Sequence, residues 1–251
     1  MKQNNSYKLI TDGFELINMK KDNIFHLNKI KNLIRNYASN EINTKNIKLE
    51  KIHLNNEMID NFNIFRLNII KKINENQIIQ NLLFQILSDK LYKLFGTDIS
   101  VQKNINLVIQ RPDDDSRAII HTDAPPESPY QVNFWIPLVD CKNTMSMYFF
   151  TPDKNSKIRK FLNSKNYQSN KMDIFSKKTG VNPNVKYGQY IIFSPETWHH
   201  PPINKEENTR WAINIRYKNT FSPYGKKGFL DYYKPISFSD ITTFTLENEK
   251  K

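Results

Sequence analysis

The sequence predicts a mainly β protein with N-terminal helices, in which two sheets form a roll or barrel. Apolar residues recur at helical spacing up to about residue 98 and then give way to short β-rich runs. Pro, Gly, Asn and Asp separate these runs, and no regular alternation of strand and helix follows, which argues against a doubly wound parallel sheet. The length of 251 residues fits a single domain, 1–251, with an apolar core of its own.

The first part of the chain, about 1–98, is predicted to be a helical support for the β core. Its apolar residues fall three or four apart, which is typical of two to four amphipathic helices. They form three stretches: Ile24, Leu27, Ile30, Leu33 and Ile34; Ile59, Phe62, Phe65, Leu67 and Ile70; and Ile78, Ile79, Leu82, Leu83, Ile86, Leu87, Leu91 and Leu94. The third stretch ends at Gly96, and glycine is common just beyond the end of a helix.

The β core is expected at about 100–220, where six runs are rich in β-branched and aromatic residues. The candidate strands are 105–110, 118–123, 131–139, 145–151, 185–193 and 210–218. The polar, lysine-rich segment 152–184 is predicted to be an insertion or loop at the mouth of the barrel. Residues 221–251 are predicted to wrap the body, with the last few residues frayed.

The formal net charge of +12 raises the question of nucleic-acid binding, because a clustered basic face attracts phosphate. The lysines are instead scattered along the chain among many Asn and Ile residues. Such a pattern fits a solvated surface, so the charge alone does not predict a nucleic-acid partner.

Cysteine usage and hydropathy predict a cytoplasmic protein. Cys141 is the only cysteine, so neither an internal disulfide nor a thiolate zinc site can form. The first residues are polar, and no run of about 18 apolar residues occurs, so we expect no signal peptide and no membrane partner. The oligomeric state cannot be predicted from the sequence.

A metal site is predicted from three side chains. His121 and Asp123 are two positions apart in a candidate strand and therefore point to one face. His199 and His200 follow the candidate strand 185–193 and supply a second imidazole. Two histidines and one carboxylate on one side of an octahedral ion form the facial triad of non-haem Fe(II) oxygenases, which leaves positions open for catalysis. His26 and His53 lie in the helical part and are not predicted to be ligands.

An anion site is predicted beside the metal. Arg210 follows His199 by 11 residues and opens a candidate strand, so antiparallel pairing returns it toward the metal. Its guanidinium can pair in bidentate fashion with a carboxylate such as the distal end of 2-oxoglutarate. Alternate positions place Arg210, Asn214 and Arg216 on one face of the strand, although a solvent-facing edge strand would give the same pattern.

The candidate strand 131–139 is predicted to line the same cavity. Gln131, Asn133 and Trp135 alternate along it and share one face, while Val132 and its apolar neighbours share the other. We therefore expect Asn133, Trp135 and also Arg216 to contact the co-substrate. A plain core position is the alternative for Trp135.

Three blocks of the sequence resemble the phytanoyl-CoA dioxygenase superfamily, and within it the branch found in carbohydrate and surface-polysaccharide gene clusters. The blocks are IQRPDDDSRAIIHTDAPPESPYQVNFWIPLVD, NTMSMYF and YGQYIIFSPETWHHPPINKEENTRWAINIRYK. The superfamily pattern after the distal histidine is matched by His199, Asn204, Thr209 and Arg210, which selects His199 over His200. The resemblance implies a double-stranded β-helix (a jelly roll, cupin-like), Fe(II) as the metal and 2-oxoglutarate as co-substrate. His200 and Pro201 stand where the superfamily commonly has glycine and a small polar residue.

The resemblance implies a dioxygenase that uses O2 to hydroxylate a small molecule such as a sugar or nucleotide sugar. Gln110, Arg111 and the segment 152–184 are expected to supply polar contacts to that substrate. One alternative is an AlkB-like nucleic-acid dealkylase, which also carries two arginines six positions apart after the distal histidine. Another is a cupin-like binding module without chemistry, against which the intact set of His121, Asp123, His199 and Arg210 argues.

Overall fold

The computed structural model describes residues 7–59, 61–123, 128–164 and 169–249, and antiparallel strands form its centre. The main sheet has the order β1-β6-β4-β8-β2-β9, and β3 also pairs with β8. A second, two-stranded sheet pairs β5 with β7. The strand bounds are β1 Phe14–Asn18, β2 Ile99–Gln102, β3 Asn106–Gln110, β4 Gln131–Pro137, β5 Tyr148–Phe149, β6 Gln189–Phe193, β7 His199–His200, β8 Arg210–Asn219 and β9 Tyr233–Ser237.

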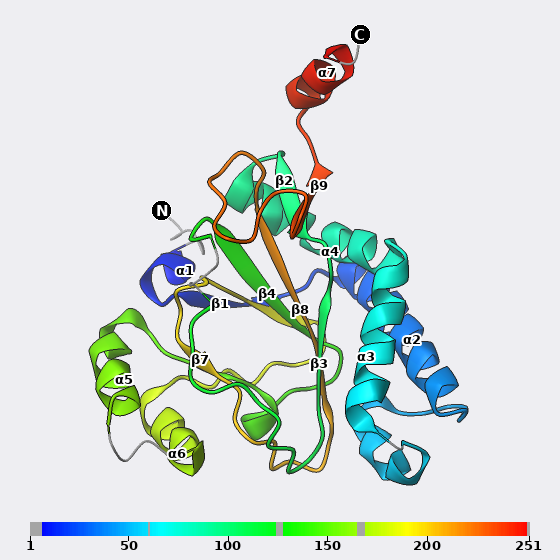
Figure 1. Ribbon diagram of the computed structural model, residues 1–251, viewed down its shortest axis with the longest axis vertical. Coiled ribbons are helices and arrows are strands. Elements are labelled where there is room, and N and C mark those ends of the chain that lie inside the picture. The colour runs from blue at the N-terminus through cyan, green and yellow to red at the C-terminus, as the bar shows by residue number, and fades with distance from the viewer. Residues whose placement is uncertain (1–6, 60, 124–127, 165–168, 250–251) are drawn as a thin grey trace.

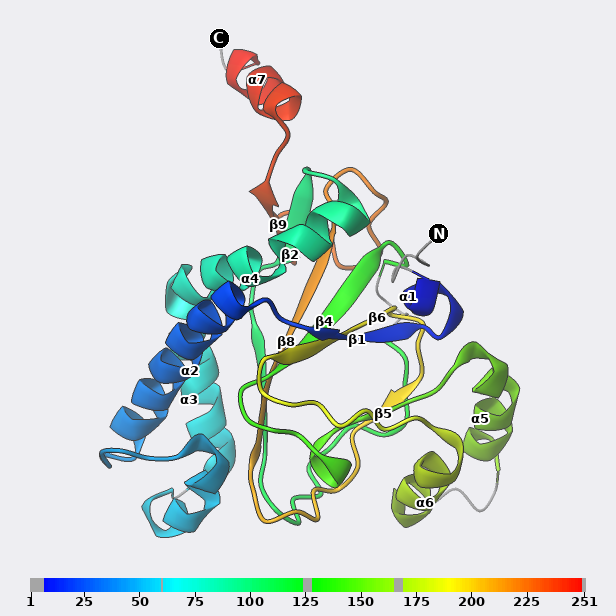
Figure 2. The same ribbon diagram turned by 180° about the vertical axis from the view of Figure 1, so that it is seen from behind.

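The three predicted helical stretches are confirmed as α2 (Lys21–Glu41), α3 (Phe62–Glu75) and α4 (Ile78–Phe95). Gly96 caps α4 with φ +74°, a conformation that L side chains rarely adopt. Figures 1 and 2 show these helices together on one side of the strands. Their buried faces and the strands form one apolar core, in which Leu27 and Ile213 are fully buried. The short helix α1 (Tyr7–Thr11) and the 3-10 helix η1 (Leu49–Met58) complete this part of the chain.

Two candidate strands differ from the structure. Residues 118–123 form no strand; His121 makes an isolated antiparallel bridge with His199 instead. Within 145–151 only the two residues of β5 form a strand, and a 3-10 turn, Asn143–Met145, precedes it. Both runs have β-forming residues, but each forms too few backbone hydrogen bonds with a neighbouring segment to make a longer strand. The strands β1, β2, β7 and β9 lie outside all the candidate runs.

The segment 152–184, predicted to be an insertion or loop, contains two helices. After the short turn Pro152–Lys154, α5 (Asn155–Leu162) and α6 (Ser169–Thr179) lie on the side of the strands opposite α2, α3 and α4 (Figures 1 and 2). A second apolar cluster attaches them to the small sheet, with Ile120, Phe150, Ile158 and Met172 at its centre.

The C-terminal tail has two parts. Strand β9 pairs with β2 at the edge of the main sheet. Beyond it, α7 (Asp240–Asn248) extends away from the body in Figure 1 and buries none of its side chains. In the part of the chain that the structure describes, no helix combines the length and the apolar character that a membrane span requires.

Candidate metal centre

Three side chains with metal-binding atoms meet where the two sheets approach each other. One ligand atom each of His121, Asp123 and His199 lies within 4.8 Å of the other two. The backbone brings the histidines together: His121 N donates to His199 O at 3.1 Å, and His199 N donates to His121 O at 2.9 Å. The bridge therefore fixes two segments that are 78 positions apart in the sequence.

Backbone carbonyls orient both imidazole rings. His121 Nδ1 lies 2.7 Å from Ile119 O, and His199 Nδ1 lies 3.0 Å from Thr197 O. A carbonyl can only accept, so each Nδ1 carries the hydrogen and each Nε2 keeps a lone pair for a metal. Burial lowers the pKa of His199 to about 4, and the neighbouring His121 adds to that effect, so His199 is neutral at physiological pH.

Asp123 is held as a carboxylate by two polar side chains. Its Oδ2 accepts from Asn133 Nδ2 at 2.6 Å and from Arg216 Nη2 at 3.2 Å, while Oδ1 lies 3.6 Å from His121 Nε2. Burial raises the pKa of Asp123, but His199, Arg216 and His121 together lower it further, so the net shift is downward. Asn133 and Arg216, which the strand patterns predict to contact the co-substrate, thus contact Asp123.

A cavity of about 200 Å³ opens at these three residues. Trp135 and Arg210 line it together with His121, Asp123 and His199, and the other lining residues are Asn106, Val108, Ala118, Met147, Pro201, Asn214 and Arg216. Of these additional residues, Asn214 could have been found from the sequence, because it shares the alternating face of Arg210. Asn106 and Met147 carry no comparable signal.

Arg210 is a buried cation in this cavity. Its side chain is 3% exposed, Nη1 donates to Ser146 O at 3.4 Å, and Nε has no partner among the described residues. Burial lowers the pKa of Arg210 to about 10, so the guanidinium remains charged near neutral pH. A buried, incompletely paired guanidinium is costly, and an anionic ligand in the cavity would offset that cost.

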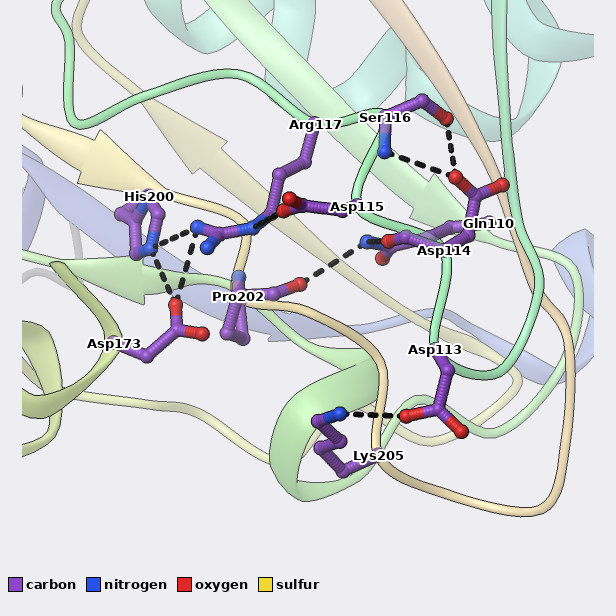
Figure 3. Close-up of polar contacts among 10 residues, drawn as sticks. All are labelled: Gln110, Asp113, Asp114, Asp115, Ser116, Arg117, Asp173, His200, Pro202 and Lys205. Atoms are coloured by element: carbon purple, nitrogen blue, oxygen red, sulfur yellow. Dashed lines mark hydrogen bonds and ion pairs between the residues drawn. The ribbon is translucent and has the colours of Figure 1, made fainter. Parts of the chain in front are cut away.

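His200 faces away from the cavity. Its Nε2 lies 2.8 Å from Asp173 Oδ1 on α6 and 2.9 Å from Arg117 Nη1 (Figure 3). His26 and His53 are likewise outside the three-residue cluster. Gln110 and Arg111 line a neighbouring pocket instead of the metal cavity.

The fold is shared with solved structures of low sequence identity. A non-heme monooxygenase, ThoJ in complex with nickel, has a TM-score of 0.61 at 15% identity, covering 94% of this chain and 85% of its own. The non-heme alpha ketoglutarate dependent carbocyclase SnoK, from nogalamycin biosynthesis, has a TM-score of 0.56 at 11% identity over 95% and 94% of the two chains. HygX from Streptomyces hygroscopicus, with nickel and 2-oxoglutarate bound, has a TM-score of 0.56 at 11% identity over 92% and 91%. No family model and no curated protein sequence matches the chain.

Proposed function

We propose that the protein is an Fe(II)- and 2-oxoglutarate-dependent dioxygenase that hydroxylates a small molecule. One observation carries the proposal: the donor atoms of His121, Asp123 and His199 converge within 4.8 Å in a cavity that also contains the buried guanidinium of Arg210. The structural neighbours, which include a non-heme monooxygenase and an alpha ketoglutarate dependent carbocyclase, support the same class of chemistry. The separate small sheet of β5 and β7 supports a double-stranded β-helix of the phytanoyl-CoA dioxygenase type.

The donor set fits Fe(II). His121 and His199 would bind through Nε2, because each Nδ1 already donates to a carbonyl, and Asp123 would bind through Oδ1. Three protein ligands leave the remaining positions of an octahedral ion for co-substrate and O2. When bound, the iron supplies O2 activation and substrate oxidation. Asn133 and Arg216 keep Asp123 ionised and oriented toward the metal.

Arg210 would bind the distal carboxylate of 2-oxoglutarate. Arg210 is the first residue of β8, and its guanidinium is charged and buried. Burial strengthens the pairing of a guanidinium with a carboxylate. Trp135 is 1% exposed and forms an apolar wall of the same cavity, which limits the access of water. The substrate is proposed to be a sugar or nucleotide sugar, with Gln110 and Arg111 in the adjoining pocket as contacts.

Anaerobic titration tests the proposal. Protein mixed with Fe(II) and 2-oxoglutarate should show a visible charge-transfer band that neither component gives alone. The substitutions His121→Ala and Asp123→Ala should abolish the band and iron binding, whereas the control His26→Ala should leave both unchanged. Absence of the band from the unmodified protein would reject the enzyme function.

The same titration tests the choice of distal histidine. His199→Ala should abolish iron binding, and His200→Ala should not, because His200 contacts Asp173 and Arg117 instead of the cavity. The opposite result would identify His200, and not His199, as the distal ligand.

A further inference from the structure

A second pocket adjoins the metal cavity and is lined by arginines. It has a volume of about 440 Å³ and lies between the start of α3, the end of β3 and the segment 111–118. Arg66, Arg111, Arg117 and Arg210 line it, and we refer to it as the arginine pocket. It shares four lining residues with the metal cavity: Val108, Ala118, Pro201 and Arg210.

The positive charge of the arginine pocket is only partly neutralised. Arg117 pairs with Asp115 and Asp173, each at 3.2 Å (Figure 3), and Arg111 Nε lies 3.8 Å from Asp114 Oδ2. Asp114 is the one acidic residue among the described lining residues. In the same described part of the chain, neither Arg66 nor Arg210 pairs with a carboxylate.

Neighbouring side chains hold two of the guanidinium groups in place. The Arg111 guanidinium lies over the ring of Phe62, 4.0 Å from its centroid. Arg66 donates from Nη2 to Asn63 Oδ1 at 2.9 Å. Phe62 and Asn63 form the first turn of α3, which has no acidic residue, so the positive end of the helix dipole adds to the potential there. These groups are positioned before any anion arrives, which lowers the entropic cost of binding.

Gln110 also lines this pocket and has a buried acceptor atom without a partner among the described residues. Its side chain is 2% exposed, and Nε2 donates to Pro202 O at 3.1 Å and to Asp114 O at 3.2 Å (Figure 3). Its Oε1 has no partner among the described residues. A buried acceptor without a donor is costly, so this atom indicates a ligand that carries a hydroxyl or amine donor.

We propose that the arginine pocket binds the phosphate group of a small, hydroxyl-bearing phosphorylated molecule. Guanidinium groups that come from α3 and from the segment 111–118 suit a tetrahedral oxyanion, whereas a flat carboxylate is satisfied by one guanidinium group such as that of Arg210. The volume lies within the range of small-molecule sites and leaves room for more than one phosphate. The statement that this molecule is the substrate and extends through the shared residues toward the metal rests on the proposed function.

Calorimetry on the metal-free protein tests the pocket independently of activity. Inorganic phosphate and glucose 1-phosphate should bind, and glucose should not. Arg66→Gln should weaken glucose 1-phosphate binding about 10-fold or more, because one charge-assisted contact is lost. Arg66→Lys should recover part of that loss. The control Arg35→Gln, at an exposed position of α2 outside the pocket, should have no effect.

The arginine side-chain NMR signals locate the bound phosphate. Nε–Hε resonances assigned with Arg66→Gln and Arg111→Gln should shift when phosphate is added, and the Arg35 resonance should not. Circular dichroism and the melting temperature of each variant separate a lost contact from a lost fold. Equal weakening by Arg66→Gln and Arg35→Gln would show non-specific charge attraction and overturn the proposal.

Competition identifies what the pocket recognises. Phosphate and 2-oxoglutarate should bind together to the iron-loaded protein; displacement of phosphate by 2-oxoglutarate would assign the pocket to the co-substrate and overturn the proposal. Tighter binding of a single-stranded oligonucleotide, weakened by Arg35→Gln and by salt, would also overturn it. Phosphate binding by a protein that gives no band with Fe(II) and 2-oxoglutarate would support the pocket and contradict the proposed oxygenase.

Discussion

At the scale of residues, Arg210 and Arg216 share one face of β8 but have different surroundings. Arg216 donates to Asp123 through Nη2 and to Gln102 and Tyr232 through Nη1. Among the described residues, Arg210 has one hydrogen bond, to a backbone carbonyl, and its Nε has no partner. The same residue type therefore has two different environments on one strand: Arg216 is bound to Asp123, a proposed metal ligand, and Arg210 remains available to an anion.

Substitution of Arg210 should affect the co-substrate selectively. We expect Arg210→Gln to retain Fe(II) binding and to weaken 2-oxoglutarate about 10-fold or more, because a buried charge pair loses one partner. Calorimetric titration of the anaerobic iron-loaded protein with 2-oxoglutarate measures this. If Arg216→Gln alone produced that pattern, the anchor would be Arg216.

Substitution of Arg216 should act on the metal instead. Arg216→Gln removes a hydrogen bond that orients Asp123, so Fe(II) affinity should fall about 10- to 100-fold. A competition titration with a metal chelator measures the affinity, and Arg35→Gln is the matched surface control. An unchanged affinity would contradict the orienting role of Arg216.

Sequence periodicity predicts the positions of some of these side chains but not their contacts. Alternation along a strand is enough to place Arg210, Asn214 and Arg216 on one face, since the geometry is local. It cannot show that Arg216 pairs with Asp123, because that contact depends on how β8 lies against a segment 93 positions away. No sequence pattern predicts the contact of Asp173 with His200, because this contact arises from the packing of α6 on the small sheet.

At the scale of elements, two hydrogen bonds connect Gly13, which precedes β1, to His199 of the candidate metal centre. Gly13 has φ +81°, and its carbonyl accepts from Thr197 Oγ1 at 2.7 Å. The carbonyl of Thr197 in turn accepts from His199 Nδ1. A Cβ on Gly13 would lie 2.5 Å from Thr197 Oγ1, which is too close for an unstrained contact. Both this close approach and the positive φ therefore require glycine at position 13.

Gly13→Ala should therefore disturb both stability and metal binding. We expect a loss of about 1–3 kcal/mol from backbone strain together with a weaker Fe(II) affinity as Thr197 is displaced. Gly188→Ala is the matched control: its φ is +87°, but the nearest atom to its Cβ is at an ordinary 3.5 Å. Chemical denaturation and metal titration of both variants measure the two effects. Equal metal affinities would show that Thr197 adjusts without consequence.

Helix α6 depends on a polar contact with the small sheet. Asp173→Ala removes the partner that His200 and Arg117 share, while Arg117 keeps Asp115. Because Asp173 is partly exposed, we expect only about 1 kcal/mol of destabilisation, confined to this helix. Hydrogen exchange of the α6 amides should accelerate, and Lys177→Ala, an exposed position on the same helix, should leave it unchanged. Unaltered exchange in Asp173→Ala would mean that the apolar cluster alone attaches α6.

The elements that the sequence predicts well are those with long local periodicity. The helices α2, α3 and α4 each repeat their apolar residues over several turns. Strand β1 is only five residues long, and its extended form depends on pairing with β6 in a distant part of the chain. The run 118–123 shows the converse, since its β-forming residues find only the single bridge of His121 to His199.

At the scale of the whole molecule, α7 contributes little to the body. Deletion of residues 240–251 removes no buried side chain of the described helix and leaves the contact of Ser239 with Asp98. We expect the melting temperature to change by less than about 2 °C and Fe(II) binding to remain. Differential scanning fluorimetry checks this. A large loss of stability would show that Phe244 and Ile241, both exposed in the helix, are covered in solution.

Because Phe14 of β1 pairs with Phe193 of β6, β1 cannot complete its pairing until most of the chain has been synthesised. β1 emerges from the ribosome 179 residues before its partner, so at ordinary rates of translation it waits roughly 10–40 s for β6. Glu15, which pairs with Lys90 in the finished protein, places a charge within the waiting strand and disfavours its pairing with a stray edge. A nascent chain that ended before His199 would lack one of the three proposed metal ligands, so the site can form only after β6 has been made.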